Sequence, residues 1–161
     1  MGREMAAEVR KFLGADHARL DELLTQTLSG SSSVDYEAWQ AFRHGLLQHI
    51  AWEETILMVA LRKSGAAKEL CDRIRADHAL LAALLVPPPR AELVLTARRI
   101  LAEHNKVEEA MDGLYAQCLE VADDDELLAQ IRAMPKVSVS PPRSGPDIEA
   151  HITRLLRARQ R

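Results

Sequence analysis

Apolar side chains recur every three or four residues along most of the chain, the spacing that places them on one face of an α-helix. Glycine, serine and proline interrupt this pattern near residues 30–33, at Ser64-Gly65 and at residues 87–89, where helices are expected to end. The pattern therefore predicts an all-α protein made of two consecutive helical hairpins. The expected helices run from about Glu4 to Leu28, from Asp35 to Ser64, from Ala66 to Val86, and from the prolines after Val86 to about Val121.

The chain beyond these helices has a different pattern. Acidic residues from Asp123 open a short helical stretch that Met134-Pro135 closes, and residues 136–145 are proline-rich. A last helix from Pro146 has an apolar edge and an arginine-rich face. We expect two regions, a bundle over 1–122 and a helical appendage over 123–161. The appendage is expected to pack on the bundle or a partner subunit; the alternative is a docking helix for another protein or an anionic surface.

Two near-copies of Leu-x-x-His-x-x-x-Glu-Glu lie on the apolar stripes, at residues 46–54 and 101–109. In each copy the histidine and the first glutamate are four residues apart, so a helix places them on one face, where they form a chelate. The two pairs are His49 with Glu53 and His104 with Glu108.

A second repeated motif lies one helix upstream of each chelate. Residues 15–20 and 76–81 share Ala-Asp-His-Ala, which adds His17 and His78 to the interior stripes. Each hairpin thus contributes one histidine from its first helix and a His-x-x-x-Glu from its second. This duplication predicts a site with approximate twofold symmetry and two metal ions.

The spacing of the four histidines also predicts where the turns fall. If neighbouring helices are antiparallel and the histidines lie at one level, each turn lies midway between successive histidines. The midpoints are residue 33, residues 63–64 and residue 91, which fall in the serine run, beside Ser64-Gly65 and just after the prolines.

Six ionisable side chains in a bundle interior cannot satisfy one another without a cation, because burying unpaired charges is costly. Imidazole and carboxylate ligands without thiolate suit iron, manganese or zinc. We expect two ions bridged by Glu53 and Glu108, with positions left open for an oxo or hydroxo bridge and a small molecule. The predicted metal ligands are His17, His49, Glu53, His78, His104 and Glu108.

Composition and other motifs exclude several classes of function. The 161 residues are 47% apolar and 28% charged with a formal net charge of -3, which gives no general case for nucleic acid or membrane binding. With no apolar signal segment and no span-length apolar run, a cytoplasmic location is expected. No P-loop, dinucleotide fingerprint or nucleophile elbow occurs, and no catalytic residue is predicted. The two cysteines, Cys71 and Cys118, are expected to be buried, reduced thiols.

The ordered set Asp16-His17, His49-x-x-x-Glu53-Glu54, Asp77-His78 and His104-x-x-x-Glu108-Glu109 resembles the hemerythrin-like family, the HHE cation-binding domain. The resemblance covers about residues 5–121. It implies an up-down-up-down antiparallel four-helix bundle, here with a C-terminal helical appendage, that holds a non-haem di-iron centre. Family roles include reversible oxygen binding, oxygen, redox or iron sensing, iron handling, and defence against oxidative and nitrosative stress.

The sequence departs from the family pattern at two places. Hemerythrins that carry oxygen have another histidine four residues from the third-helix histidine, whereas Ile74 and Ala82 flank His78 here. This chain therefore resembles the four-histidine, two-carboxylate members. The family spacing would select Glu109 as the last carboxylate, whereas the interior stripe favours Glu108.

The leading functional hypothesis is a di-iron protein, with manganese or zinc as alternatives, that binds O2, NO or peroxide in stress defence, iron handling or sensing. The alternative is a metal- or oxygen-responsive interaction module that signals to a homodimer or protein partner through residues 146–161. Around the site, Trp52 and Met111 are expected to line a pocket and Glu54 and Glu109 to flank or support the ligands. Tyr115, about 16 Å of helix rise from His104, is expected to be core.

Overall fold

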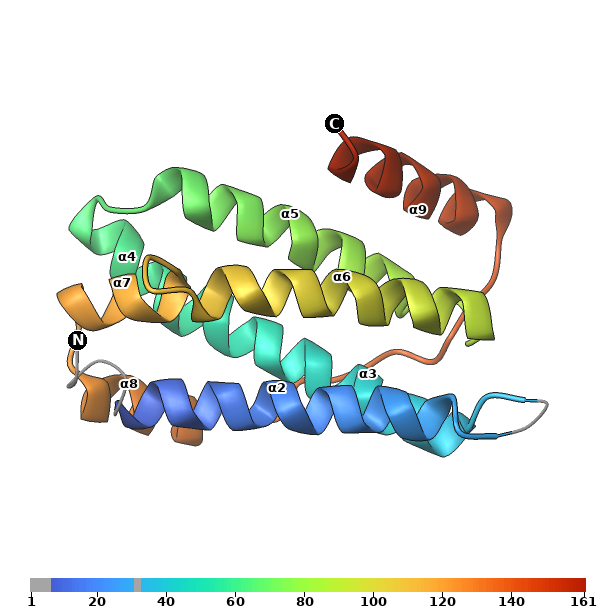
Figure 1. The fold of residues 1–161 in the computed structure, drawn as a ribbon, viewed down its shortest axis with the longest axis horizontal. Helices are drawn as coiled ribbons and strands as arrows, with labels where there is room; N and C mark the ends of the chain where they lie inside the picture. Colours follow the sequence, from blue (N-terminus) through green and yellow to red (C-terminus); the bar gives the residue numbers. More distant parts are fainter. Residues whose placement is uncertain (1–6, 31–32) are drawn as a thin grey trace.

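The computed structural model describes residues 7–30 and 33–161, which form an antiparallel helical bundle with further helices from the C-terminal part of the chain (Figure 1). This part of the chain contains no β-strand, so the predicted fold class is confirmed. The predicted helix start at Glu4 and residues 31–32 of the serine run lie outside the described residues. The elements are α2 (Glu8–Thr27), α3 (Tyr36–Trp52), η1 (Glu53–Leu57), α4 (Met58–Ser64), α5 (Lys68–Leu84), α6 (Ala91–Glu109), α7 (Leu114–Val121), α8 (Asp124–Ala133) and α9 (Pro146–Arg159).

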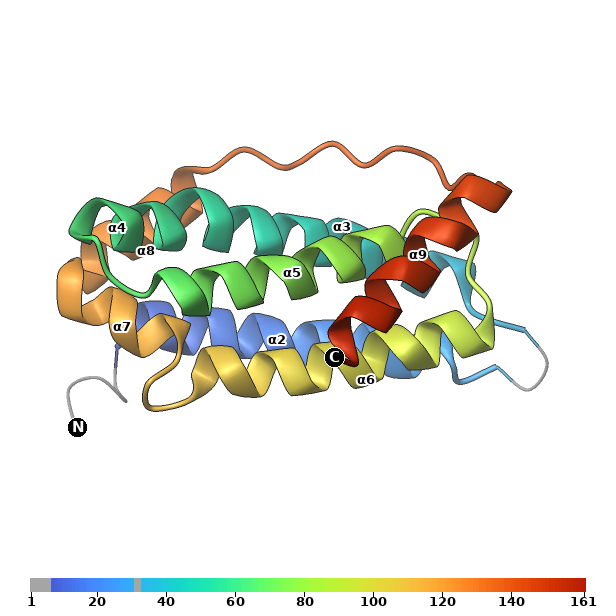
Figure 2. The same ribbon diagram turned by 90° about the horizontal axis from the view of Figure 1, so that it is seen from above.

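The four long arms of the bundle turn back where the histidine spacing predicts. The second arm consists of α3, the π-helix η1 and α4, and it ends at Gly65, whose φ of 75° is in the left-handed region that glycine adopts without strain. The helix α6 begins at Ala91, immediately after the prolines. Figures 1 and 2 show α2 beside α3 and α5 beside α6, as two hairpins.

Two aspartates begin helices as the sequence indicates. The side chain of Asp35 accepts a hydrogen bond from the backbone N–H of Ala38 at the start of α3 (3.0 Å). Asp123 accepts one from the backbone N–H of Glu126 at the start of α8 (3.1 Å). Each carboxylate satisfies a donor that the first helical turn leaves free, which fixes where the helix begins.

The apolar core consists of two clusters, one toward each end of the bundle. On α2, Leu13 belongs to one cluster and Leu20 to the other, and His17 lies between them. On the second arm, His49 likewise lies between Leu46 and Ile56, which belong to different clusters. A layer of buried polar side chains therefore divides the core at the level where the sequence places the metal ligands.

The C-terminal region contacts both ends of the bundle. Near the start of α2, the Asp124 carboxylate accepts hydrogen bonds from the backbone N–H groups of Glu8 (2.7 Å) and Val9 (2.8 Å). Figure 2 shows residues 135–145 running along α3, and α9 lying against α5, where Ile148 and Ile152 join the apolar core. This packing matches the predicted appendage, while the domain boundary at residue 122 stays a prediction.

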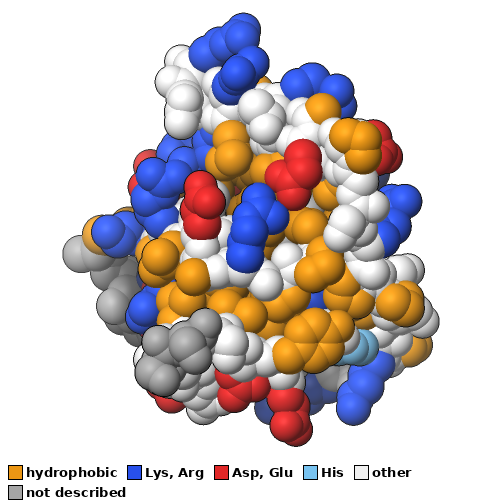
Figure 3. All heavy atoms as spheres, turned by 90° about the vertical axis from the view of Figure 1, so that its right-hand side faces the viewer, with side chains coloured by type: hydrophobic (Ala, Val, Ile, Leu, Met, Phe, Trp, Pro, Cys, Tyr) orange, Lys and Arg blue, Asp and Glu red, His pale blue; other side chains and the backbone are white. Residues whose placement is uncertain are grey.

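Two further features are the side chains exposed at one end of the bundle and whether any helix is suited to cross a membrane. Where α2 passes to α3 and α5 to α6, the end of the bundle has apolar side chains among charged ones (Figure 3). Partly buried Leu28 and Val34 belong to this end and pack against the core. Among residues 7–30 and 33–161, no helix combines the length and the apolar character that crossing a membrane requires.

Candidate metal centre

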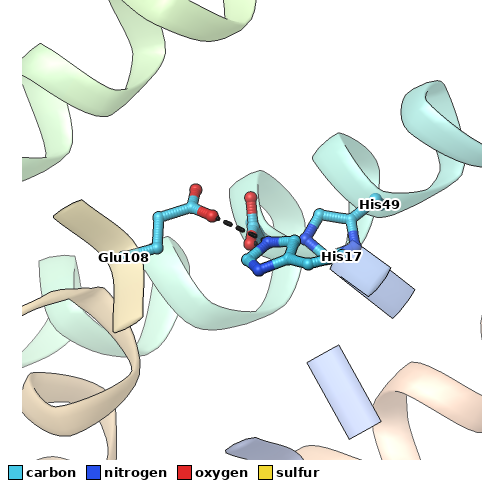
Figure 4. Close-up of side chains that lie close together, drawn as sticks. His17, His49 and Glu108 are labelled. Atoms are coloured by element: carbon cyan, nitrogen blue, oxygen red, sulfur yellow. Dashed lines mark hydrogen bonds and ion pairs between the residues drawn. The ribbon is translucent and has the colours of Figure 1, made fainter. Parts of the chain in front are cut away.

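The six predicted ligands meet in the polar layer between the two apolar clusters. They fall into two overlapping groups, and within each group one nitrogen or oxygen atom from every residue lies within 4.8 Å of all the others. None of the six is more than 5% exposed. Figure 4 shows Glu108 extending from α6 toward His17, with His49 beside it. The groups are His17, His49, Glu53 and Glu108, and Glu53, His78, His104 and Glu108.

Both glutamates belong to both groups, because each spans the two hairpins. Every carboxylate oxygen of the pair approaches the Nε2 atom of at least one histidine, and each glutamate reaches histidines of both hairpins. The contacts are Glu53 to His49 (2.9 Å) and His78 (3.1 Å), and Glu108 to His104 (2.6 Å), His17 (3.2 Å) and His78 (3.5 Å). This is the arrangement expected of two bridging carboxylates between two cations.

The other ring nitrogen of each histidine, Nδ1, lies next to a carboxylate outside the cluster. The four pairs are His49 with Asp16 (2.8 Å), His104 with Asp77 (3.2 Å), His17 with Glu109 (2.5 Å) and His78 with Glu54 (2.8 Å). Hydrogen bonds of this kind fix the tautomer and the ring orientation of metal-binding histidines, and they make the inner nitrogen more basic. All four Nε2 atoms are thereby turned toward the same interior point.

The four Nδ1–carboxylate pairs give a role to the acidic residues that flank the ligands in the repeated motifs, Asp16, Glu54, Asp77 and Glu109. The aspartates of the two Ala-Asp-His-Ala copies serve the second histidine of their own hairpin. Glu54 and Glu109 instead serve the first histidine of the opposite hairpin, which confirms their expected supporting position. Glu108 is fully buried in the cluster and Glu109 is 43% exposed, so the structure favours Glu108 as the inner carboxylate.

The imidazoles and the glutamates shift each other's protonation. Burial by itself lowers the pKa of each imidazole, but the neighbouring carboxylates outweigh it and raise the pKa of His49 to about 10, of His78 to about 11 and of His104 to about 9. Burial raises the pKa of Glu108, yet the imidazoles, with His104 first, hold it well below its usual value. Without a metal, His49, His78 and His104 therefore carry protons, which a bound cation must displace.

Three buried polar atoms of the cluster show whether a cation would fit there. Glu53 Oε2, His78 Nε2 and Glu108 Oε1 are buried atoms with no suitably oriented hydrogen-bond partner. All three point into the cluster, and each has a lone pair that can face a cation once the imidazoles have lost their protons. Their lone pairs have the chemistry that a divalent cation requires. The donor set thus fits a pair of metal ions sharing Glu53 and Glu108.

Tyr115 also lies at the cluster, and the prediction that it is merely core was wrong. Its hydroxyl group lies 2.6 Å from Glu53 Oε1 and 3.0 Å from His17 Nε2. The prediction assumed one continuous helix to Val121, whereas α6 ends at Glu109 and α7 begins at Leu114. The chain folds back between them and brings Tyr115 to the ligand level.

Gly113 makes this reversal possible and is the sequence signal that could have revealed it. A Cβ atom at this position would collide with the backbone carbonyl groups of Val107 and Glu108, so only glycine fits. A glycine inside a predicted helix often marks such a close approach of backbone. The corresponding place on the other arm is also irregular, because η1 is a wider π-helix that starts at Glu53.

The predictions for other residues around the site were confirmed only in part. Met111 is 72% exposed in the reversal, so the expectation that it lines a pocket was wrong. Trp52 does lie near the site, with its ring centroid 6.1 Å from that of His49. The two cysteines are buried and free, as predicted. Burial raises the pKa of Cys118 to about 12, which keeps this thiol protonated.

Comparison with known proteins supports the assignment. Residues 9–86 match the family model of the Hemerythrin HHE cation binding domain. This range includes His17, His49, Glu53 and His78, and it ends before the second His-x-x-x-Glu. Neither curated proteins nor solved structures gave a match. Residues 9–86 thus belong to the hemerythrin HHE cation-binding family, and the chain folds as a hemerythrin-type helical bundle with a buried His/Glu cluster able to bind metal.

Proposed function

We propose that this protein is a non-haem di-iron protein whose metal centre binds O2, NO or peroxide in oxidative or nitrosative stress defence, iron handling or sensing. The observation that carries the proposal is the pair of four-residue groups sharing Glu53 and Glu108. Four nitrogens and two bridging carboxylates give fewer protein ligands than two six-coordinate ions require. The remaining positions can accept small ligands.

The donor set suits iron and does not suit calcium. Neutral imidazole with carboxylate suits iron, manganese and zinc, and calcium would prefer oxygen ligands alone. Both described thiols lie outside the two groups. A pair of irons would supply redox chemistry toward oxygen, nitric oxide or peroxide.

The chain's own residues would hold the centre and exclude water from it. The four outer carboxylates orient the imidazoles, and the ligands are at most 5% exposed. Such burial favours small ligands over large substrates. The interior is also apolar on both sides of the polar layer, which strengthens electrostatic interactions inside it.

The test is metal analysis followed by spectroscopy. Protein purified without added metal should contain about two irons per chain, as expected for a bundle with two ligand groups. The absorption spectrum of the reduced, iron-loaded protein should change on admitting air or nitric oxide. Absence of iron, together with failure of the metal-free protein to take it up, would contradict the proposal.

A second candidate function, a metal-responsive interaction module, is favoured by one contact of the C-terminal helix. Arg159 on α9 donates a hydrogen bond to Asp77 Oδ1 (2.9 Å), while Asp77 Oδ2 pairs with His104 Nδ1 (3.2 Å). Arg159 also forms an ion pair with Glu103 (2.9 Å). Metal held by His104 and the docking of α9 would then stabilise each other, because coupling between two sites is reciprocal.

Hydrogen exchange tests this second function. Iron loading should increase protection of the α9 amides in the wild type, and Arg159→Gln should remove most of that increase. The Arg159→Gln substitution should also weaken the affinity for iron by about fivefold, which is at the low end of the affinity changes seen in allosteric coupling. The matched control is Arg157→Gln, a residue of the same helix whose side chain is exposed. Equal protection of α9 with and without iron would overturn the coupling.

Deletion of residues 146–161 separates the two functions. Reactivity with oxygen or nitric oxide should persist if the metal centre acts alone. Binding to a partner should vanish if α9 carries the signal. Because Ile148 and Ile152 belong to the apolar core, unfolding of the truncated protein must be measured alongside.

A further inference from the structure

The hydroxyl group of Tyr115 contacts every member of one of the two ligand groups. It approaches His17 Nε2 (3.0 Å), His49 Nε2 (3.4 Å), Glu53 Oε1 (2.6 Å) and Glu108 Oε2 (3.2 Å). These four residues are the complete first group. The side chain of Tyr115 is fully buried.

A phenol that served only as a buried hydrogen-bond donor would need one acceptor, because it has a single proton. Here the oxygen lies within 3.4 Å of two imidazole nitrogens and two carboxylate oxygens, all of which face the interior of the cluster. A cation that satisfies those four atoms would lie next to the phenol oxygen as well. Oxygen ligands of this kind suit a ferric ion as well as carboxylates do.

We propose that Tyr115 is a further protein ligand, binding as a phenolate to the ion held by His17 and His49. This inference rests on the proposed metal-binding function. On binding, the phenolic O–H bond breaks, an oxygen–metal bond forms, and the proton leaves to solvent. No change of oxidation state is involved.

The assignment makes the two ions unequal. The first ion would have five protein donors, and the second, held by Glu53, His78, His104 and Glu108, would have four. The chain has two tyrosines, and the other, Tyr36, is 50% exposed at the start of α3. A small exogenous ligand would therefore bind beside His78 and His104.

Spectroscopy of the ferric protein provides the test. Wild type and the control Tyr36→Phe should show a visible phenolate-to-iron charge-transfer band with resonance-enhanced tyrosine vibrations. Tyr115→Phe should lose the band and retain most of its iron. Zinc should likewise produce the ultraviolet difference spectrum of tyrosinate in wild type and Tyr36→Phe, and should not in Tyr115→Phe.

Iron content is measured on every sample, so the possible failures can be told apart. A wild type that contains iron but shows neither the band nor the vibrations would overturn the role of Tyr115, even if Tyr115→Phe does not fold. A wild type that takes up no metal would overturn the proposed function, and this inference with it. A band that persists in Tyr115→Phe would also refute the assignment.

Discussion

The hairpin of α2 and α3 and the hairpin of α5 and α6 bring the same residues to the metal site in the same order, but they differ around it. Inside the site, each hairpin provides two histidines and one glutamate. Each also provides an aspartate for its own second histidine and a glutamate for the other hairpin's first. The duplicated motifs therefore preserve the ligands together with the groups that orient them.

The differences begin one layer further out. Asp16 pairs with Arg19 of the same helix (2.8 Å), whereas Asp77 pairs with Arg159 from the distant helix α9 (2.9 Å). After the inner glutamate, the first hairpin continues through the π-helix η1, and the second breaks off and admits Tyr115. The part that the two hairpins share consists of the candidate ligands and the carboxylates that orient them. The contacts further out differ, so the two ligand groups have different surroundings.

The largest effects are expected from removing equivalent ligands of the two hairpins. His49→Ala and His104→Ala should each lose most of the bound iron. Each should also reduce the free energy of unfolding by about 3–5 kcal/mol, because two buried carboxylates lose their partner. Iron analysis and denaturant unfolding provide the measurements.

The matched control for these variants is His44→Ala, since His44 is exposed on α3, outside the cluster. It should keep its iron and change stability by less than about 0.5 kcal/mol. An unchanged iron content and melting temperature in His49→Ala would contradict the ligand assignment. A large difference between the two ligand variants would show that the symmetry does not extend to binding energy.

An intermediate effect is expected where the hairpins differ most, at the reversal before α7. Gly113→Ala should destabilise the protein by about 2–4 kcal/mol, because its Cβ collides with the carbonyl groups of Val107 and Glu108. It should also displace Tyr115 from the site. Gly14→Ala is the control on α2, where a Cβ meets nothing within 4 Å, and it should stabilise by about 0.5–1 kcal/mol.

Denaturant unfolding measures both glycine variants under one set of conditions. If Gly113→Ala were as stable as the wild type, the reversal would not depend on glycine. The contrast with the continuous first hairpin would then need another cause.

The smallest effect is expected from protonation of the equivalent histidines, His49 and His104, in the metal-free protein. With pKa values raised from 6.5 to about 10 for His49 and about 9 for His104, both stabilise the fold when protonated. This stabilisation is complete below about pH 6.5 and is lost as the pH rises through about 9 to 10. NMR titration should show both histidines losing their protons well above pH 6.5, with stability falling over the same range. Titration of both near pH 6.5 would contradict this account.

Helical periodicity predicted much of the architecture, for a simple reason. The apolar stripes and the positions of Ser64-Gly65 and the prolines depend on residues close together in the chain, so local sequence determines them. The inward direction of His17, His49, His78 and His104 follows from the same stripes. The duplication then indicated that these residues meet at one level, and the structure brings them together.

Three features were missed or misplaced because they depend on distant residues. The pairing of Glu54 with His78 and of Glu109 with His17 crosses from one hairpin to the other. The contact of Arg159 with Asp77 joins residues 82 positions apart. The position of Tyr115 depends on a break that the apolar pattern, continuous through Leu114 and Cys118, does not reveal.

The sequence by itself determined the helices, their turns and the set of side chains that face the interior, because a helix fixes the direction of each side chain relative to its near neighbours. The tertiary structure decided which carboxylate serves which histidine, which end of the site receives the phenol and where α9 docks. These depend on which helix faces which, and on the reversal after Glu109, and no periodicity within a single helix specifies them.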